Sequence, residues 1–286
     1  MTRVYFHNSW NERPSDLLKR YSRQTPGCSG IWKNIVGVED PSKADVVIVL
    51  GGTRGYGEVF RGKEIIFVTR EPDFIEKPPN LQGVHTLEWT KSHTGITWWV
   101  NKTYDELKSL EYPNKKKKIS CVVSSKHSRR LSFVQRLFSE ECKIDLWGRG
   151  HAGAYNGKDF YMGELNYSGN CKLNGLLPYE YTVVLENSSQ NNYWTEKLAD
   201  AYLSWCFPIY WGCPNINEFF KEKSFKSISI DDPNPHESIM ELINSPLTEN
   251  EFRLIKESRE AILENYNIWE VIRKKIIDLG LEHEVL

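Results

Sequence analysis

The sequence predicts an α/β fold with two lobes, each built on a parallel sheet. Near-continuous apolar runs, of which Ala44–Leu50 is the clearest, are typical of strands buried on both faces. Polar loops and amphipathic helices separate such runs, as in βαβ units. The pattern restarts after Tyr112–Lys118, a segment with one proline and four lysines that is typical of an exposed linker. We therefore expect an N-terminal lobe over residues 1–114 and a C-terminal lobe over residues 115–286.

In the first lobe, strands are indicated by apolar runs and a helix by its start signal. The helix follows Pro14 and Ser15, and proline suits the first turn of a helix. The expected elements are, in order, a strand at Val4–His7, a helix around Asp16–Tyr21, and strands at Ala44–Leu50 and Glu64–Thr69.

The second lobe shows the same alternation, with helical stripes between short strands. In the segment Thr195–Trp205, apolar side chains recur on one helical face. The expected elements are a strand at Ile119–Ser124, a helix at Arg130–Phe138, strands at Ile144–Gly148 and Tyr181–Glu186, a helix at Thr195–Trp205, strands at Pro208–Trp211 and Phe225–Ile230, and two closing helices from about Pro235 and Glu249.

Composition narrows the classes of function. A formal net charge of -1 over 286 residues gives no bulk attraction to nucleic acid or to an anionic membrane, so an anion site must be built locally. The chain lacks both an apolar run of about 18 residues and an N-terminal signal pattern, which predicts no transmembrane segment and a cytoplasmic location. The 6 cysteines include no Cys-x-x-Cys pair and no zinc-ligand spacing, which favours reduced thiols over disulfides or a metal site. The histidines show no metal-ligand spacing, and a dinucleotide-type glycine fingerprint is missing.

The most informative stretch is Val184–Leu198, where a strand leads through a polar loop into a helix that opens with Thr195, Glu196 and Lys197. Free backbone N–H groups and the helix dipole make such a helix start suitable for an anion. A lysine is unfavourable in a first helical turn unless an anion is also bound there. We therefore expect Lys197 to contact a phosphate, although a solvated lysine is the competing interpretation.

A second basic helix start follows the strand at Ile119–Ser124, where Arg129 and Arg130 stand side by side. The planar guanidinium suits a pyrophosphate better than a point charge does. An exposed basic helix start is the alternative interpretation.

The block from Glu186 to Lys197, followed by Pro208–Gly212, resembles the donor-binding motif of the α1,3/α1,4-fucosyltransferase family (glycosyltransferase family 10), in its soluble bacterial or viral form. Asp145–Gly150 is similar to a further loop segment of that family. The resemblance spans roughly residues 119–230. It implies the GT-B glycosyltransferase fold, in which two Rossmann-like lobes face a central cleft, with the acceptor bound on the first lobe.

The resemblance also implies roles for individual residues. Tyr193, Glu196 and Lys197 match positions that contact the GDP-sugar, and Arg130 rather than Arg129 matches a phosphate-binding arginine. Glu186 and Asn187 stand at the strand end, within reach of the nucleotide, although Asn187 also suits a turn.

A catalytic base is expected on the first lobe. Glu71 follows a strand and would project from the carboxyl end of a sheet, where α/β proteins bind ligands. It also matches the glutamate that the family carries before a Ser-Pro turn, but here Pro72 follows directly. Because this spacing departs from the family's, Glu58, Asp73 and Glu76 remain alternatives.

The implied function is transfer of fucose from GDP-fucose to a hydroxyl of an acceptor glycan, with inversion and an α1,3-type linkage. No cofactor is expected, and metal-independent catalysis would leave the charge of the departing GDP to Arg130 and Lys197. The alternatives are the same fold with another GDP- or UDP-sugar, and a non-catalytic protein that binds a nucleotide sugar or a glycan.

Overall fold

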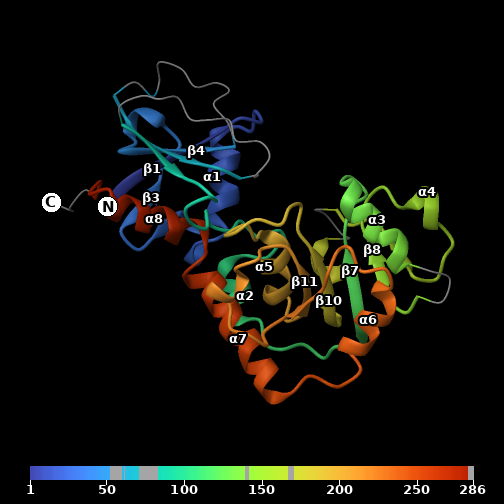
Figure 1. Ribbon diagram of the computed structural model, residues 1–286. Coiled ribbons are helices and arrows are strands. Elements are labelled where there is room, and N and C mark those ends of the chain that lie inside the picture. The colour runs from blue at the N-terminus through green and yellow to red at the C-terminus, as the bar shows by residue number, and fades with distance from the viewer. Residues whose placement is uncertain (52–59, 61, 71–82, 139–141, 167–170, 283–286) are drawn as a thin grey trace. The chain divides into compact units, whose positions relative to one another are not determined.

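The computed structural model describes residues 1–51, 60, 62–70, 83–138, 142–166 and 171–282 (Figure 1). Its segments pack into two units. Unit 1 comprises Met1–Thr97, Lys102–Ser109 and Leu263–Leu286, and unit 2 comprises Trp98–Asn101 and Leu110–Ile262. Each unit has a largely parallel sheet flanked by helices, so the predicted pair of α/β lobes is confirmed.

In the described part of unit 1, six strands form one sheet in the order β2-β3-β1-β4-β5-β6. β2 pairs with β3 in the antiparallel sense, and the other pairings are parallel. The strands are β1 (Thr2–Asn8), β2 (Ile31–Trp32), β3 (Ile35–Gly37), β4 (Val46–Leu50), β5 (Glu64–Val68) and β6 (Val84–Leu87), and the helices are α1 (Pro14–Ser22), α2 (Tyr104–Ser109) and α8 (Ile268–Asp278).

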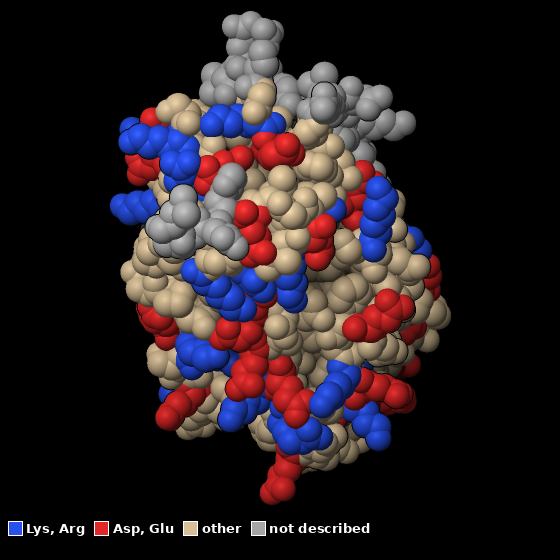
Figure 2. All heavy atoms as spheres, turned by 90° about the vertical axis from the view of Figure 1, so that its left-hand side faces the viewer, with Lys and Arg blue, Asp and Glu red and all other residues tan. Residues whose placement is uncertain are grey.

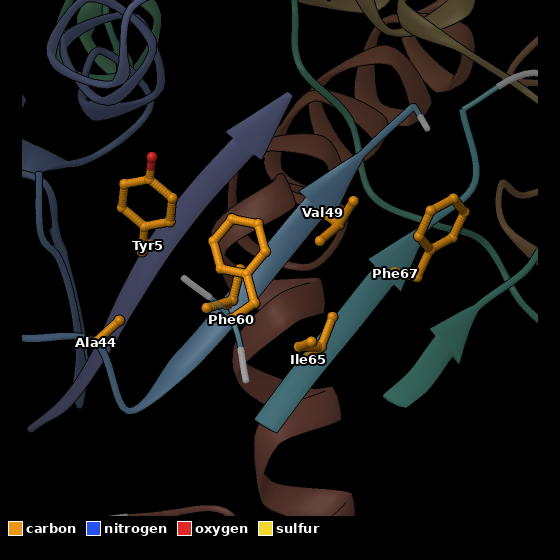
Figure 3. Packing of buried hydrophobic residues seen from close by; sticks show 7 residues of the cluster. Tyr5, Ala44, Val49, Phe60, Ile65 and Phe67 are labelled. Atoms are coloured by element: carbon orange, nitrogen blue, oxygen red, sulfur yellow. The ribbon is translucent and has the colours of Figure 1, made fainter. Parts of the chain in front are cut away.

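All five residues of β4 are buried. Because successive side chains of a strand point to opposite sides, both faces of the unit 1 sheet are covered there. One face carries a buried cluster that includes Tyr5, Val49 and Phe67 (Figure 3). On the other face, the ring of Phe6 stacks on Tyr21 of α1 at a centroid distance of 4.8 Å and meets Trp269 of α8 edge-on at 5.1 Å.

The last helix of the chain therefore belongs to unit 1, whereas the sequence-based division places all of residues 115–286 in the second lobe. Trp269 is fully buried, and its indole N–H donates to the carbonyl oxygen of Tyr21 at 2.9 Å. Asn267 caps α8 by accepting from the backbone N–H of Trp269, and its own amide donates to Gln24. This cap starts a third closing helix where the sequence predicts two.

In unit 2, six described strands form a fully parallel sheet in the order β12-β11-β10-β7-β8-β9. The strands are β7 (Lys117–Val122), β8 (Asp145–Trp147), β9 (Tyr161–Gly163), β10 (Tyr179–Leu185), β11 (Phe207–Trp211) and β12 (Lys226–Ser227). The helices are α3 (Ser128–Leu137), α4 (Ala152–Tyr155), α5 (Glu196–Leu203), α6 (Pro235–Leu242) and α7 (Glu249–Glu264). The strand predicted at Phe225–Ile230 shortens to β12, an edge strand that pairs with β11 only at Lys226 and Ser227.

The lysine run predicted as an exposed linker between the lobes lies wholly within unit 2. Lys117 and Lys118 begin β7 and form ion pairs with Asp145 at 2.6 Å and Glu180 at 2.9 Å. Lys115 is partly buried, and its ammonium donates to the carbonyl oxygens of residues 177 and 204. These contacts join segments that are distant in the sequence, so the composition of the lysine run alone could not predict them.

Charged side chains of both signs are interspersed on the face shown in Figure 2, in keeping with the net charge of -1. Within the described part of the chain, no helix combines the length and the hydrophobicity needed to cross a membrane.

Candidate active site

The strand order of unit 2 marks a place where ligands bind in open α/β sheets. β7 comes first in the chain, β8 and β9 follow on one side of it, and β10 to β12 follow on the other. Ligands bind beyond the carboxyl ends of the strands where the order reverses, which is here between β7 and β10. The residues that follow these two strands lead directly to the predicted donor-binding side chains.

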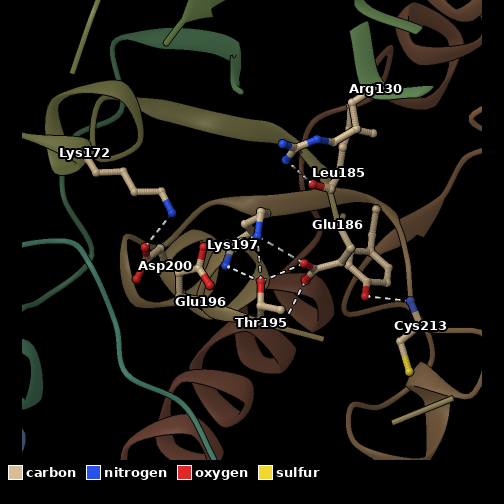
Figure 4. A network of polar contacts seen from close by, with 10 residues as sticks. Arg130, Lys172, Leu185, Glu186, Thr195, Glu196, Lys197, Asp200 and Cys213 are labelled. Carbon is tan, nitrogen blue, oxygen red and sulfur yellow. Dashed lines mark hydrogen bonds and ion pairs between the residues drawn. The ribbon is translucent and has the colours of Figure 1, made fainter. Parts of the chain in front are cut away.

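Glu186, the first residue after β10, organises the start of α5 (Figure 4). Its carboxylate is fully buried and accepts from the backbone N–H of Thr195 at 2.8 Å and from the Thr195 hydroxyl at 2.7 Å. The ammonium of Lys197 lies 3.6 Å from the same carboxylate. Burial raises the pKa of Glu186, against the opposing effects of Lys197 and Thr195. Glu186 thus fixes the start of α5 through its contacts with Thr195 and Lys197.

Lys197 and Glu196 form an ion pair in the first turn of α5. The Lys197 ammonium lies 3.2 Å from the Glu196 carboxylate and 3.1 Å from the Thr195 hydroxyl. Burial alone would lower the pKa of Lys197, but the carboxylates of Glu196 and Glu186 outweigh it and raise that pKa. Burial alone would raise the pKa of Glu196, but Lys197 and Lys172 bring it to about 2. Both groups are therefore charged at neutral pH, and the Lys197 side chain keeps 19% of its surface exposed.

Arg130 approaches the same place from α3. Its side chain is only 4% exposed, and one terminal nitrogen donates to the carbonyl oxygen of Leu185 at a long 3.4 Å (Figure 4). Its Nε has no hydrogen-bond partner among the described residues. Burial lowers the pKa of Arg130, which the carboxylates of Glu186 and Glu196 oppose, and a guanidinium stays protonated at neutral pH. A buried cation with an unused donor is costly unless a ligand satisfies it.

A further ion pair that sequence reasoning missed stands beside this cluster. Lys172 contacts Asp200 of α5 at 2.6 Å, and the fully buried Asp200 also accepts from the backbone N–H of Trp99 at 2.9 Å. Burial raises the pKa of Asp200 to about 6. The spacing of four residues from Glu196 places Asp200 on the same helical face and was the available signal. Lys172 lies in a segment without a recognisable motif.

The two loop residues of the predicted set lie at different depths. Asn187 is half-buried directly after Glu186, whereas Tyr193 is fully buried, which its position in a polar loop did not indicate. Asn215 fixes this loop through two hydrogen bonds to Asn192. The Asn215 side chain accepts from the backbone N–H of Asn192 at 2.8 Å and donates to the amide oxygen of the Asn192 side chain at 3.0 Å.

Glycines at the ends of β11 and β8 permit close packing at this edge of the sheet. A Cβ on Gly212 would lie 2.4 Å from the Glu186 side chain and 2.5 Å from the Tyr210 hydroxyl. A Cβ on Gly148 would lie 1.8 Å from the carbonyl oxygen of Val123 at the end of β7. The family-like segment Asp145–Gly150 thus packs against the loop that precedes Arg130.

The proposed base, Glu71, and its alternatives Glu58, Asp73 and Glu76 lie outside the described residues. The strand expected before Glu71 is present as β5, and Arg70 beyond its end donates to the Thr97 hydroxyl at 3.4 Å. Within the described segments, no group of three or more His, Cys, Asp or Glu side chains has the arrangement of a metal site.

Comparison with known proteins places this site in context. Residues 112–253 match the sequence model of the C-terminal domain of glycosyltransferase family 10, the fucosyltransferases. An α-(1,3)-fucosyltransferase of Helicobacter pylori is 39% identical over 64 residues, which are 22% of this chain and 13% of that protein. A fucosyltransferase-like protein of Arabidopsis thaliana is 25% identical over 177 residues, or 61% of this chain and 32% of that protein. The matches thus span less than two thirds of both curated relatives.

Solved structures extend the likeness to the fold of nearly the whole chain. A crystal structure of an α1,3-fucosyltransferase with GDP-fucose superposes with a TM-score of 0.54 at 18% identity, covering 100% of this chain and 91% of that one. A DNA-modifying β-glucosyltransferase, solved with and without UDP-glucose, gives a TM-score of 0.50 at 12% identity over 97% and 100% of the chains. At these identities the likeness concerns the fold, and it confirms the predicted GT-B class.

Proposed function

Because residues 112–253 belong to glycosyltransferase family 10, we propose that this protein transfers fucose from GDP-fucose to a hydroxyl group of an acceptor glycan. The observation that carries the proposal is the pair of cations at the strand reversal of unit 2. Arg130 is buried with an unused donor, and Lys197 is held at the start of α5 by Glu186. Two fixed cations, one of them at the start of a helix, suit the diphosphate of a sugar nucleotide.

The reaction needs charge stabilisation at the leaving group. The acceptor oxygen forms its bond to the anomeric carbon as the bond from that carbon to the phosphate oxygen breaks, which inverts the anomeric configuration. Negative charge builds on the departing GDP, where Arg130 and Lys197 stabilise it. Glu196, ionised and next to Lys197, accepts hydrogen bonds from hydroxyl groups of the ribose or of the sugar. We propose that these side chains suffice without a metal ion.

The acceptor hydroxyl must lose its proton during attack. We assign this role to the carboxylate of Glu71, on the basis of its sequence position three residues after β5 ends. The proton passes from the acceptor hydroxyl to Glu71 and then to solvent.

The donor site is tested by replacing Lys197. We expect Lys197→Ala to weaken GDP binding and to lower kcat/KM for GDP-fucose by about 10- to 100-fold, since it removes one charge-assisted hydrogen bond. The measurements are calorimetric titration with GDP and release of GDP from GDP-fucose. Lys221→Ala is the matched control, because Lys221 is an exposed lysine of unit 2 paired with Glu257. Equal GDP affinity in the two variants would refute the assignment of Lys197.

The Glu71→Gln variant distinguishes a catalytic protein from one that only binds the nucleotide sugar. This variant should bind GDP like the wild type and lose transfer onto a panel of glycans, since it removes only the base. A wild-type protein that binds GDP-fucose without any transfer or hydrolysis would favour the non-catalytic alternative. A preference for GDP-mannose or a UDP-sugar would favour another donor on the same fold.

A further inference from the structure

Unit 1 presents an exposed tryptophan at the carboxyl edge of its sheet, outside the site described above. Trp10 follows β1 by two residues, and 47% of its surface is exposed. Exposed apolar side chains are common singly and need no explanation by themselves. Trp10 differs from such side chains in its surroundings, which hold the indole in one place.

The loop that carries Trp10 is fixed by one buried side chain. The amide oxygen of Asn8 accepts from the backbone N–H groups of Trp10 and Glu12, both at 3.1 Å. The amide nitrogen of Asn8 donates to the carbonyl oxygen of Glu12 at 3.0 Å. Asn8 is 8% exposed and closes the loop from Asn8 to Glu12 into a compact turn.

The indole itself is also tethered. Its N–H donates to the carboxylate of Glu12 at 2.8 Å. The same carboxylate receives two hydrogen bonds from Arg20 of α1, at 2.6 and 3.1 Å, and the guanidinium lies 5.9 Å from the centre of the indole ring. The exposed ring is therefore preorganised, and less ordering entropy is lost when a ligand stacks on it.

The place in the sheet is again one where the strand order reverses. β3 lies on one side of β1 and β4 on the other, and Asn8 at the end of β1 is opposite Leu50 at the end of β4. Gly51, the next residue, has a φ of +84°, and a Cβ there would lie 3.2 Å from the Trp10 ring. The backbone of Gly51 thus packs closely against the indole, at an edge where α/β sheets bind ligands.

We propose that Trp10, flanked by Glu12 and Arg20, binds a neutral pyranose ring of the acceptor glycan, an inference that rests on the proposed function. The flat indole offers an apolar face to the C–H groups of the sugar. The Glu12 carboxylate and the Arg20 guanidinium offer hydrogen bonds to its hydroxyl groups. These two charges neutralise each other at 2.6 Å, so the site suits an uncharged saccharide rather than a phosphorylated ligand.

The test compares the acceptor KM with the GDP affinity in the intact chain of 286 residues. The probe is the neutral glycan, from the panel, that the wild type fucosylates best. We expect Trp10→Ala to raise the KM for this acceptor roughly tenfold, as expected for the loss of one aromatic contact, while the GDP affinity stays unchanged. Trp10→Phe should restore part of the loss, because a flat ring returns. Ile277→Ala, which shortens another exposed apolar side chain of unit 1, should leave the acceptor KM unchanged.

A second variant leaves the tryptophan intact. Glu12→Ala releases the indole N–H and should raise the acceptor KM with unchanged GDP affinity. Unchanged acceptor KM in both Trp10→Ala and Glu12→Ala, with normal fucosyl transfer, would overturn the inference while the proposed function stands. If the wild type transfers fucose to no glycan, the proposed function is wrong. The inference about Trp10, which rests on that function, is then wrong as well, whatever the GDP affinity of Trp10→Ala.

Discussion

At the scale of single residues, the candidate donor site is built from buried charges that hold one another in place. Glu186 secures Thr195 and Lys197, and Asp200 secures Lys172. A buried carboxylate is costly unless hydrogen bonds and cations compensate it. Glu186 has such compensation from both Thr195 and Lys197. We therefore propose that Glu186 positions Lys197, whereas its place at a strand end predicted contact with the nucleotide.

Asp200 provides a prediction about pH. Its pKa of about 6 lies above the ordinary 3.8, so the folded state holds this proton more tightly than the unfolded state does. The stability that Asp200 contributes is therefore fully present at low pH and is lost as the pH rises between about 4 and 6. The Asp200→Asn variant does not titrate. We expect the stability of the wild type relative to this variant to fall by about 1–3 kcal/mol from pH 4 to pH 7.

Urea unfolding of the wild type and Asp200→Asn at several pH values measures this difference. An Asn side chain can still accept from the backbone N–H of Trp99, so the variant keeps that contact. A stability difference that stays constant from pH 4 to pH 7 would contradict the raised pKa.

At the scale of elements, the site depends on how closely β11 and the loop after β10 approach each other. Gly212, at the end of β11, leaves room for the Glu186 side chain and the Tyr210 hydroxyl, which receives a hydrogen bond from the backbone N–H of Cys213 at 2.9 Å. Because Glu186 in turn holds the first turn of α5, a change at Gly212 is transmitted to Lys197.

We expect Gly212→Ala to destabilise the protein by about 1–3 kcal/mol, since the new methyl group overpacks a buried contact. It should also weaken GDP binding, because displacement of Glu186 loosens Thr195 and Lys197. Urea unfolding and GDP titration measure the two effects. Gly153→Ala in α4 is the matched control, as a Cβ there meets nothing within 4 Å. Similar stability and GDP affinity in both variants would show that this close approach is unimportant.

At the scale of the whole molecule, the two units are assembled from interleaved parts of the chain. The chain leaves unit 1 at Leu110, and its last segment, residues 263–286, returns to it. α8 completes the core of unit 1 through Trp269, which contacts Phe6 of β1. Unit 1 therefore cannot be completed until the C-terminal segment is present.

We expect Trp269→Ala to destabilise the protein by about 3–5 kcal/mol, since it empties a fully buried aromatic position. Amide hydrogen exchange should show lost protection in β1 and α1 of unit 1, with β7 and β10 of unit 2 unaffected. Ile277→Ala, on the exposed side of α8, should change neither. Equal loss of protection in β10 would contradict the assignment of α8 to unit 1.

The sequence by itself determined the class of fold, and it predicted which block of residues we propose to bind the donor. Apolar runs and helical stripes of apolar side chains are local properties, so β4, β10 and α5 were predictable at or near their observed positions. Thr195, Glu196 and Lys197 are adjacent in the chain, so their common place at a helix start also followed from local rules.

Only the tertiary structure decided how distant segments meet. The contact of Lys172 with Asp200 spans 28 positions, and that of Trp269 with Phe6 joins opposite ends of the chain. Pairing at such separations depends on strand order and helix packing, which local patterns do not encode. For the same reason the sequence placed α8 in the second lobe, although the core that α8 completes begins with β1.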